Sequence, residues 1–259
     1  MDPGSKCEEK LSEERIAPII KNIGSHCIGG RILRKRFVWV PLVLLIGGVA
    51  SGALISWKSQ SKNSIPFWPS VRIPTLACPT DKDGDGLDDL KDIVAGARAE
   101  LQRKPQYRSA YYQKGYPPES EGVCTDVVWR AFRDTGYDLK GLVDQDIRAN
   151  IGKYPGVQGK PDPNIDFRRV PNLLVFLRRN AQELTREIKP GDFENLTLWQ
   201  PGDIVTYGPT HEHIAIVSDK RRPDGVPYIL HNAGPTPSES DQLQSWPSQM
   251  TGHFRFPQF

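Results

Sequence analysis

The chain has 259 residues, of which 25% are charged, and its formal net charge is only +3. This length accommodates one large domain or two small ones. The small net charge gives no support to nucleic-acid binding, which favours a clustered basic surface. Four cysteines are too few for a disulfide-rich scaffold.

The first predicted elements are a short charged segment and a membrane span. Residues 1–36 form the charged segment, and the uncharged run FVWVPLVLLIGGVASGALISW follows at 37–57. About 20 apolar residues can cross a bilayer as a helix. A soluble helix of that length would normally carry one polar face. We therefore predict a single transmembrane helix at 37–57.

The charges around this span predict its orientation. Basic residues gather just before it, and fewer follow: Arg31, Arg34, Lys35 and Arg36 precede it. The positive-inside rule then places residues 1–36 in the cytoplasm and the chain from residue 59 outside the membrane. The alternative is a cleaved signal peptide, whose charged and apolar regions would both be unusually long.

A Ser- and Pro-rich linker is expected at 58–80, followed by an extracytoplasmic domain at 81–259. Helices are predicted in its first half by apolar spacing, at 87–101, after Cys124, at 137–151 and at 170–180. Strands are predicted in its second half, at 203–207, 213–219, 227–232 and 253–256. This order predicts an α+β domain in which N-terminal helices pack on an antiparallel sheet.

The domain opens with DKDGDGLDDLKD, residues 81–92, which fits the loop pattern of calcium-binding proteins. Acidic residues stand at alternate positions, and Gly86 occupies the tight turn. The predicted ligands of a structural Ca²⁺ are Asp81, Asp83, Asp85, the Leu87 carbonyl, Asp89 and Asp92. The alternative is an acidic, solvated turn that caps the following helix.

Cys124, in SEGVCTDVVWRAF, stands where the second helix should begin. The positive end of a helix dipole favours a thiolate, so the position suits a nucleophile. A small buried packing residue is the alternative. Asp126 is expected to cap the helix rather than contact substrate.

A nucleophilic cysteine needs a base and a group that orients the base. His213 opens an apolar strand, with Ala215 expected on its face of the sheet and Ile214 on the other. A hairpin could bring His231 beside it. His211 competes with His213 for the role of base, and His253 is expected to be structural.

Several motifs recur in one order along the domain: GVCTDVVWRAF, PDPNIDFRRVPNL, PGDIV, HIAIVSD, HNAG and GHFRF. In this order they resemble the DUF1287 family, which is grouped with the NlpC/P60-like, papain-fold cysteine peptidases. The resemblance implies a papain-like domain in which Cys124 is the nucleophile, His213 the base and His231 the third polar residue.

NlpC/P60 relatives mostly cut amide bonds in the peptide stems of bacterial peptidoglycan, so the resemblance implies that substrate class. The leading hypothesis is a membrane-anchored cysteine hydrolase whose partner is peptidoglycan. Two alternatives remain: a wall-binding module without turnover, and an acyl or peptidyl transferase on the same fold.

The segment NIDFRRVPNL adds a candidate binding surface. Arginine can hold a carboxylate through two parallel hydrogen bonds, and peptide stems carry several carboxylates. The candidate residues are Asp166, Arg168, Arg169 and Asn172. The equally weighted alternative is a structural ion-pair network within the protein.

Overall fold

The computed structural model describes residues 71–259. The predicted cytoplasmic segment, the membrane span at 37–57 and most of the linker lie outside the described residues. Within 71–259, no helix combines the length and the apolar character that crossing a bilayer requires.

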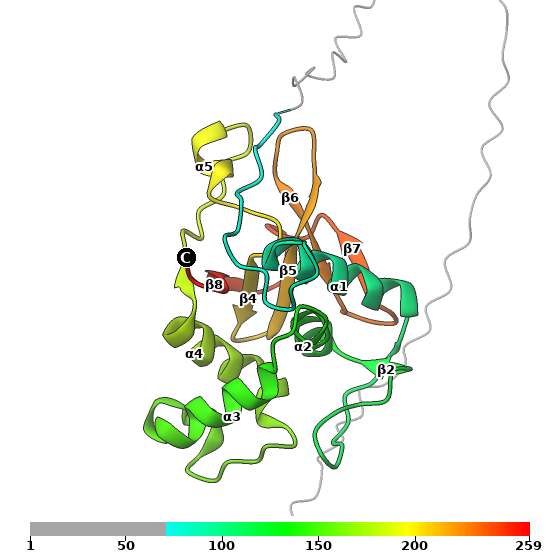
Figure 1. The fold of residues 1–259 in the computed structure, drawn as a ribbon, viewed down its shortest axis with the longest axis vertical. Helices are drawn as coiled ribbons and strands as arrows, with labels where there is room; N and C mark the ends of the chain where they lie inside the picture. The colour runs from blue at the N-terminus through cyan, green and yellow to red at the C-terminus, as the bar shows by residue number, and fades with distance from the viewer. Residues whose placement is uncertain (1–70) are drawn as a thin grey trace, which may run out of the picture. The chain divides into compact units, whose positions relative to one another are not determined.

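The described domain is α+β, with an antiparallel sheet of six strands (Figure 1). The strands lie in the order β3-β8-β4-β5-β6-β7, and every neighbouring pair is antiparallel. Their bounds are β3 Gln182–Glu183, β4 Ile204–Gly208, β5 His213–Arg221, β6 Pro227–His231, β7 Ser238–Ser240 and β8 Gln249–Arg255. The predicted antiparallel sheet is confirmed.

The helices come mainly from the first half of the domain, as predicted. They are α1 Asp89–Arg103, α2 Cys124–Asp134, α3 Leu139–Ala149, α4 Val170–Asn180 and the short α5 Phe193–Thr197. Three short 3₁₀ turns lie between α3 and α4: η1 Ile151–Lys153, η2 Pro155–Val157 and η3 Asp166–Arg168. A two-residue parallel pair, β1 Gln106–Tyr107 and β2 Glu121–Gly122, precedes α2.

The two faces of the sheet pack into different cores. Ile214 and Ile216 of β5 join a cluster with residues of α1 and α2, including Cys124. Ala215 and Val217 point to the other face, where they pack with Trp199. Because side chains alternate along a strand, the helices that carry the predicted nucleophile cover the Ile214 face.

Helices α1 and α2 pack very closely. A Cβ atom on Gly96 of α1 would lie 2.8 Å from the Cα atom of Ala131 in α2. Glycine at this position therefore permits the close approach of the two backbones. The middle of α1 therefore lies directly against the second half of α2.

The last residues of the predicted linker contact the domain. The Leu76 N–H donates to Oε1 of Gln200 at 2.8 Å, and Nε2 of Gln200 donates to the Pro74 carbonyl at 3.2 Å. Val71 packs against the core on the sheet face away from α2. Residues 71–80 thus lie along the domain surface.

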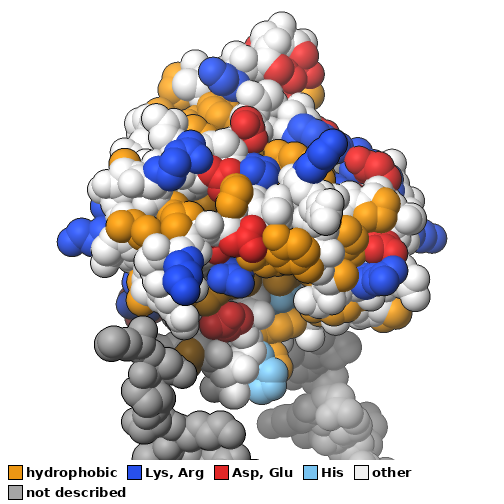
Figure 2. Space-filling view, turned by 90° about the horizontal axis from the view of Figure 1, so that it is seen from below, with side chains coloured by type: hydrophobic (Ala, Val, Ile, Leu, Met, Phe, Trp, Pro, Cys, Tyr) orange, Lys and Arg blue, Asp and Glu red, His pale blue; other side chains and the backbone are white. Residues whose placement is uncertain are grey.

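The surface carries both signs of charge. On the face drawn in Figure 2, basic and acidic side chains are interspersed with apolar ones, and histidine is visible among them. No large patch of one sign covers this face of the described residues. Long-range attraction there is weak, so recognition on this face depends on local contacts.

Candidate functional site

Cys124 is the first residue of α2 and is 8% exposed. Val123 precedes it in extended backbone as the N-cap. The Val123 N–H donates to the Asp126 carboxylate at 2.7 Å, which satisfies one of the free donors at the start of the helix. The predicted capping role of Asp126 is confirmed.

The same Asp126 carboxylate holds a buried arginine. Nε and Nη2 of Arg168 donate to its two oxygens at 2.8 Å each, and Trp129 Nε1 donates at 2.6 Å. Arg168 also donates to the Ala110 carbonyl. Its guanidinium, proposed from the sequence as a grip for a substrate carboxylate, is already paired bidentately inside the protein.

Burial decides the state of the Cys124 thiol. Desolvation raises the pKa of Cys124 to about 11, although backbone N–H groups of Ile214, Thr125 and Cys124 act in the opposite direction. The helix-start argument alone favours a lowered value. Loss of water outweighs the helix terminus here, so the resting thiol is protonated.

His213 and His231 form a hydrogen-bonded pair at the ends of adjacent strands. His213 Nε2 lies 2.8 Å from His231 Nδ1, and His231 Nε2 lies 2.8 Å from Ser240 Oγ. Burial lowers the pKa of His213 to about 3, with a further contribution from His231, and lowers the pKa of His231 to about 4. Both imidazoles are therefore neutral at pH 7.

Trp246 covers the His213 ring. The two ring centroids are 3.9 Å apart and the planes are tilted by only 14°. The indole N–H of Trp246 donates to the His211 carbonyl at 3.1 Å, which fixes the indole over the strand. No sequence pattern predicted this contact, because Trp246 lies in an irregular segment more distant in sequence from His213 than its strand neighbours.

The structure brings Cys124 to the start of β5 but not into contact with the histidines. Ile214 packs in the same buried cluster as Cys124, and His213 is the preceding residue. The His213 ring lies on the opposite face with Tyr207 and Trp246. Between residues 71 and 259, no hydrogen bond joins the Cys124 sulfur to His213 or His231, and none involves Nδ1 of His213.

The other histidines of the domain are placed differently. His211 is exposed, and its N–H donates to Ser248 Oγ. His253 is fully buried between the Asp203 carboxylate at 2.9 Å and the Thr185 carbonyl at 2.6 Å, and it stacks on Trp199. The expected structural role of His253 is confirmed.

Asp166, Arg169 and Asn172 lie together beside Cys124. Asn172 Nδ2 and Arg169 Nη1 each donate to Asp166 Oδ1 at 3.3 Å. Asp166 and Asn172 are buried, whereas 45% of the Arg169 side chain is exposed. Of the two predicted arginines, Arg169 alone keeps a solvent-facing guanidinium.

A cavity of about 480 Å³ opens in front of Cys124. Its lining includes Tyr107, Cys124, Arg169, Asn172 and Glu212. Tyr107 and Glu212 were not singled out from the sequence, because their place beside Cys124 depends on chain segments that meet only in the fold. Another cavity, of about 510 Å³ beside the C-terminal half of α2, contains none of the predicted site residues.

The acidic loop lies before α1. Asp81, Asp83, Asp85 and Asp92 each place one carboxylate oxygen in a group whose members are within 4.8 Å of one another. Asp89, expected as a further ligand, instead accepts from the Lys82 N–H at 2.7 Å and the Tyr137 hydroxyl at 2.6 Å. Leu87 is exposed at the turn into α1.

The two cysteines of the described residues are both free thiols. Cys78 is buried and contacts Thr80 Oγ1 at 3.1 Å, and Cys124 is buried at the start of α2. A disulfide between them, which would have blocked the candidate nucleophile, does not form. The Cys124 sulfur is therefore not held in a disulfide.

Comparison with known proteins gives two matches. The family model described as "Domain of unknown function (DUF1287)" matches residues 94–256. The protein YijF of Escherichia coli (strain K12), described as uncharacterized, is 38% identical over 172 residues, covering 63% of this chain and 80% of YijF. No solved structure matches. With most of the domain matched by the family model, the chain belongs to the DUF1287 family.

Proposed function

We propose that this protein is a membrane-anchored cysteine hydrolase that cleaves amide bonds in bacterial peptidoglycan peptide stems. Its domain would belong with the NlpC/P60-like, papain-fold peptidases. Cys124 is the nucleophile, His213 the general base, and His231 holds the base in position. The anchor is the apolar segment 37–57, with residues 1–36 in the cytoplasm and the domain outside.

One observation carries the proposal: the first two residues of β5 link the two candidate groups. Ile214 packs in the same buried cluster as Cys124, and the adjoining His213 is bonded through Nε2 to His231 at 2.8 Å. A base oriented by a third group is the arrangement that nucleophilic catalysis requires. With Nε2 engaged, Nδ1 of His213 is the nitrogen left to accept a proton.

The pKa values favour a neutral resting pair. The pKa of Cys124 is raised to about 11 and that of His213 is lowered to about 3, both chiefly by burial. Proton transfer from sulfur to Nδ1 must therefore accompany attack on the carbonyl rather than precede it. For this step the His213 ring must leave its position beside Tyr207 and Trp246 and bring Nδ1 within about 3 Å of the sulfur, so the proposal requires the imidazole to move when substrate binds.

The reaction then follows the usual two steps of covalent catalysis. The sulfur bonds to the carbonyl carbon, the C–N bond breaks, and His213 returns its proton to the departing amine. Water, deprotonated by His213, releases the acyl group from Cys124 and restores the thiol.

The cavity beside Cys124 supports an anionic peptide as substrate. Arg169 lines it with a partly exposed guanidinium whose Nη1 makes two long hydrogen bonds, to Asp166 at 3.3 Å and to the Gly156 carbonyl at 3.4 Å. A guanidinium with free donors binds carboxylates in bidentate fashion. Arg168, enclosed by Asp126, instead supports the floor of the site.

A second candidate is a muropeptide-binding module without turnover. The observation that favours it is the dry thiol, whose pKa is raised to about 11 and which has no hydrogen bond to a base in residues 71–259. In that case the cavity and Arg169 would bind the peptide stem while Cys124 serves only as a packing residue.

The decisive test uses the full chain in detergent with purified peptidoglycan. The wild type should release muropeptide fragments, and Cys124→Ala should lower the rate by at least about 10³-fold, since the nucleophile is lost. Cys78→Ala is the matched control and should retain activity. Binding of peptidoglycan by both proteins with no fragment release by either would establish the non-catalytic module instead.

A further inference from the structure

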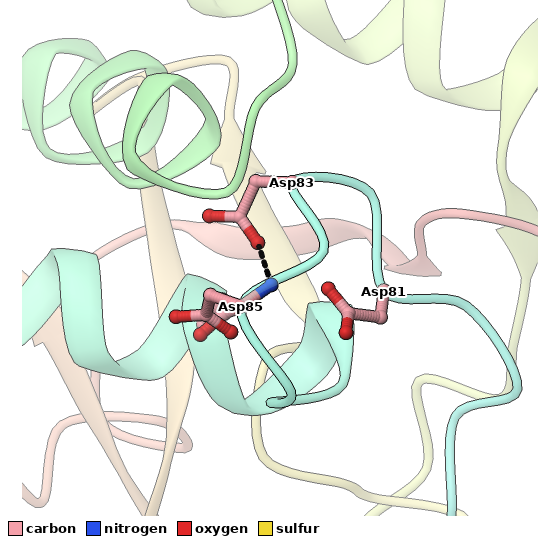
Figure 3. Close-up of side chains that lie close together, drawn as sticks. Asp81, Asp83 and Asp85 are labelled. Atoms are coloured by element: carbon pink, nitrogen blue, oxygen red, sulfur yellow. Dashed lines mark hydrogen bonds between the residues drawn. The ribbon is translucent and has the colours of Figure 1, made fainter.

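The four clustered aspartates before α1 form a compact group of oxygen ligands. Asp81, Asp83 and Asp85 come from one tight loop, whose turn depends on Gly86 at a φ of 96° (Figure 3). Hydrogen bonds inside the loop, such as that from the Asp85 N–H to Asp83 Oδ1 at 3.2 Å, hold its shape. Asp92 reaches the same point from the first turn of α1.

Asp92 supplies an independent sign that a ligand belongs there. The residue is only 6% exposed, and its buried Oδ2 atom has no hydrogen-bond partner in the described part of the chain. A buried carboxylate oxygen without a donor is strongly unfavourable.

No side chain of the described residues neutralises this group. Ion pairs of lysine or arginine involve none of its four members. The nearest lysines in sequence are directed elsewhere: Lys91 pairs with Asp88 at 2.6 Å, and Lys82 lies 5.8 Å from the centre of the Tyr137 ring. Within residues 71–259, the charge of the four carboxylates is therefore not balanced by an ion pair, which suits a cation as ligand.

We propose that Asp81, Asp83, Asp85 and Asp92 bind one structural Ca²⁺ ion. Calcium takes about six to eight oxygen ligands in flexible geometry, so four carboxylates supply most of its shell and water the rest. Mg²⁺ keeps most of its own water and rarely sits among four carboxylates. Asp89 is left out of the ligand set because its carboxylate lies outside this group of oxygens and is directed to the Lys82 N–H and the Tyr137 hydroxyl.

The ion would hold the acidic loop at the start of the domain against α1 and the turn after α2. Asp92 lies on α1, and the loop also touches the turn after α2, where a Cβ atom on Gly136 would lie 3.2 Å from Asp83 Cβ. Binding at this point therefore stabilises the α1–α2 pair at the end remote from Cys124. The site is independent of the proposed hydrolase and lies upstream of the matched residues 94–256.

The test is calcium titration of the full chain in detergent after removal of metals with EDTA. Calorimetry should show binding to one site, and saturating CaCl₂ should raise the Tm by about 5 °C, because a ligand bound only to the folded state stabilises it. The same concentration of MgCl₂ should raise it by less than half as much. An equal response to Mg²⁺, or none to Ca²⁺, overturns the assignment.

Two matched variants separate a ligand from a structural carboxylate. Asp92→Asn should melt at or above the wild-type temperature in EDTA, since it removes a repelled buried charge, and its calcium affinity should fall at least 10-fold. Asp89→Asn should melt lower than wild type in EDTA, because the amide keeps only one acceptor oxygen for the two donors, the Tyr137 hydroxyl and the Lys82 N–H, and should keep its calcium response. The reverse pattern of calcium responses would falsify the proposed ligand set.

Discussion

At the start of β5, a thiol and two imidazoles are kept dry and neutral, whereas the loop before α1 crowds four carboxylates around one point. Burial acts in both regions but moves the pKa values differently: it lowers those of His213 and His231, and it raises that of Asp92 together with its charged neighbours. Acidification therefore has opposite effects on the two regions. Protonation adds a buried charge to the histidines, whereas it removes one of several like charges from the acidic loop.

The largest expected effect is the loss of stability when the carboxylate that holds the start of α2, next to Cys124, is removed. Asp126→Ala removes the acceptor of the Val123 N–H and leaves Arg168 charged, buried and unpaired. Loss of one partner from a buried ion pair should lower the free energy of unfolding by about 3–5 kcal/mol. Urea denaturation of the wild type and the variant measures this difference in the free energy of unfolding.

Asp134→Asn is the control for Asp126→Ala, on the same helix. Asp134 pairs with Arg133 and Arg103 at the partly exposed end of α2, so its loss should change stability by less than about 1 kcal/mol. Similar losses for the two variants would mean that Arg168 finds solvent when Asp126 is removed.

The next effect tests the neutral histidine pair through pH. The pKa of His213 falls from 6.5 to about 3 on folding. Below pH 6.5 the unfolded chain therefore binds a proton at this residue that the folded protein does not bind. Stability should therefore fall between pH 6 and pH 4, by up to about 1.4 kcal/mol per pH unit for each such histidine. His213→Gln should reduce the slope of unfolding free energy against pH by the contribution of up to one proton, about 1.4 kcal/mol per pH unit.

His211→Gln is the matched control for the pH measurement, because His211 is exposed two residues away. It should leave the slope of unfolding free energy against pH unchanged. A wild-type slope that neither substitution alters would show that His213 is protonated freely in the folded state.

The smallest expected effect concerns the contact between α1, which follows the acidic loop, and α2, which begins at Cys124. Gly96→Ala would place a Cβ atom 2.8 Å from the Ala131 Cα, so α1 and α2 must separate. Overpacking of this kind should destabilise by about 1–2 kcal/mol after the better helix propensity of alanine is included. Gly152→Ala, where no atom lies within 4 Å, should be neutral in the same thermal and urea measurements.

Regular elements were largely predictable because their signals are local. The predicted helix at 170–180 is α4, and β5 begins at His213 as its alternation indicated. Apolar periodicity is written into each segment, so it does not depend on the rest of the fold. The alternation along β5 also correctly separated Ile214 from Ala215.

Long-range pairing was not predictable in the same way. Arg168 pairs with Asp126, 42 residues earlier, rather than with Asp166 nearby, and Trp246 comes to stack on His213 from beyond the last hairpin. Many acids and aromatic residues could have served at each place. Asp89 illustrates a different limit: the loop pattern counted it as a ligand, but the first turn of α1 directs it to Tyr137.

The position of β8 has a consequence for synthesis. β8 (Gln249–Arg255) is the last strand to be made, yet it lies inside the sheet between β3 and β4 (Figure 1). Until it emerges, β4 has an unpaired edge that could pair with another chain. The growing polypeptide cannot complete its sheet segment by segment, and a chain truncated before residue 249 should accumulate as an aggregation-prone intermediate.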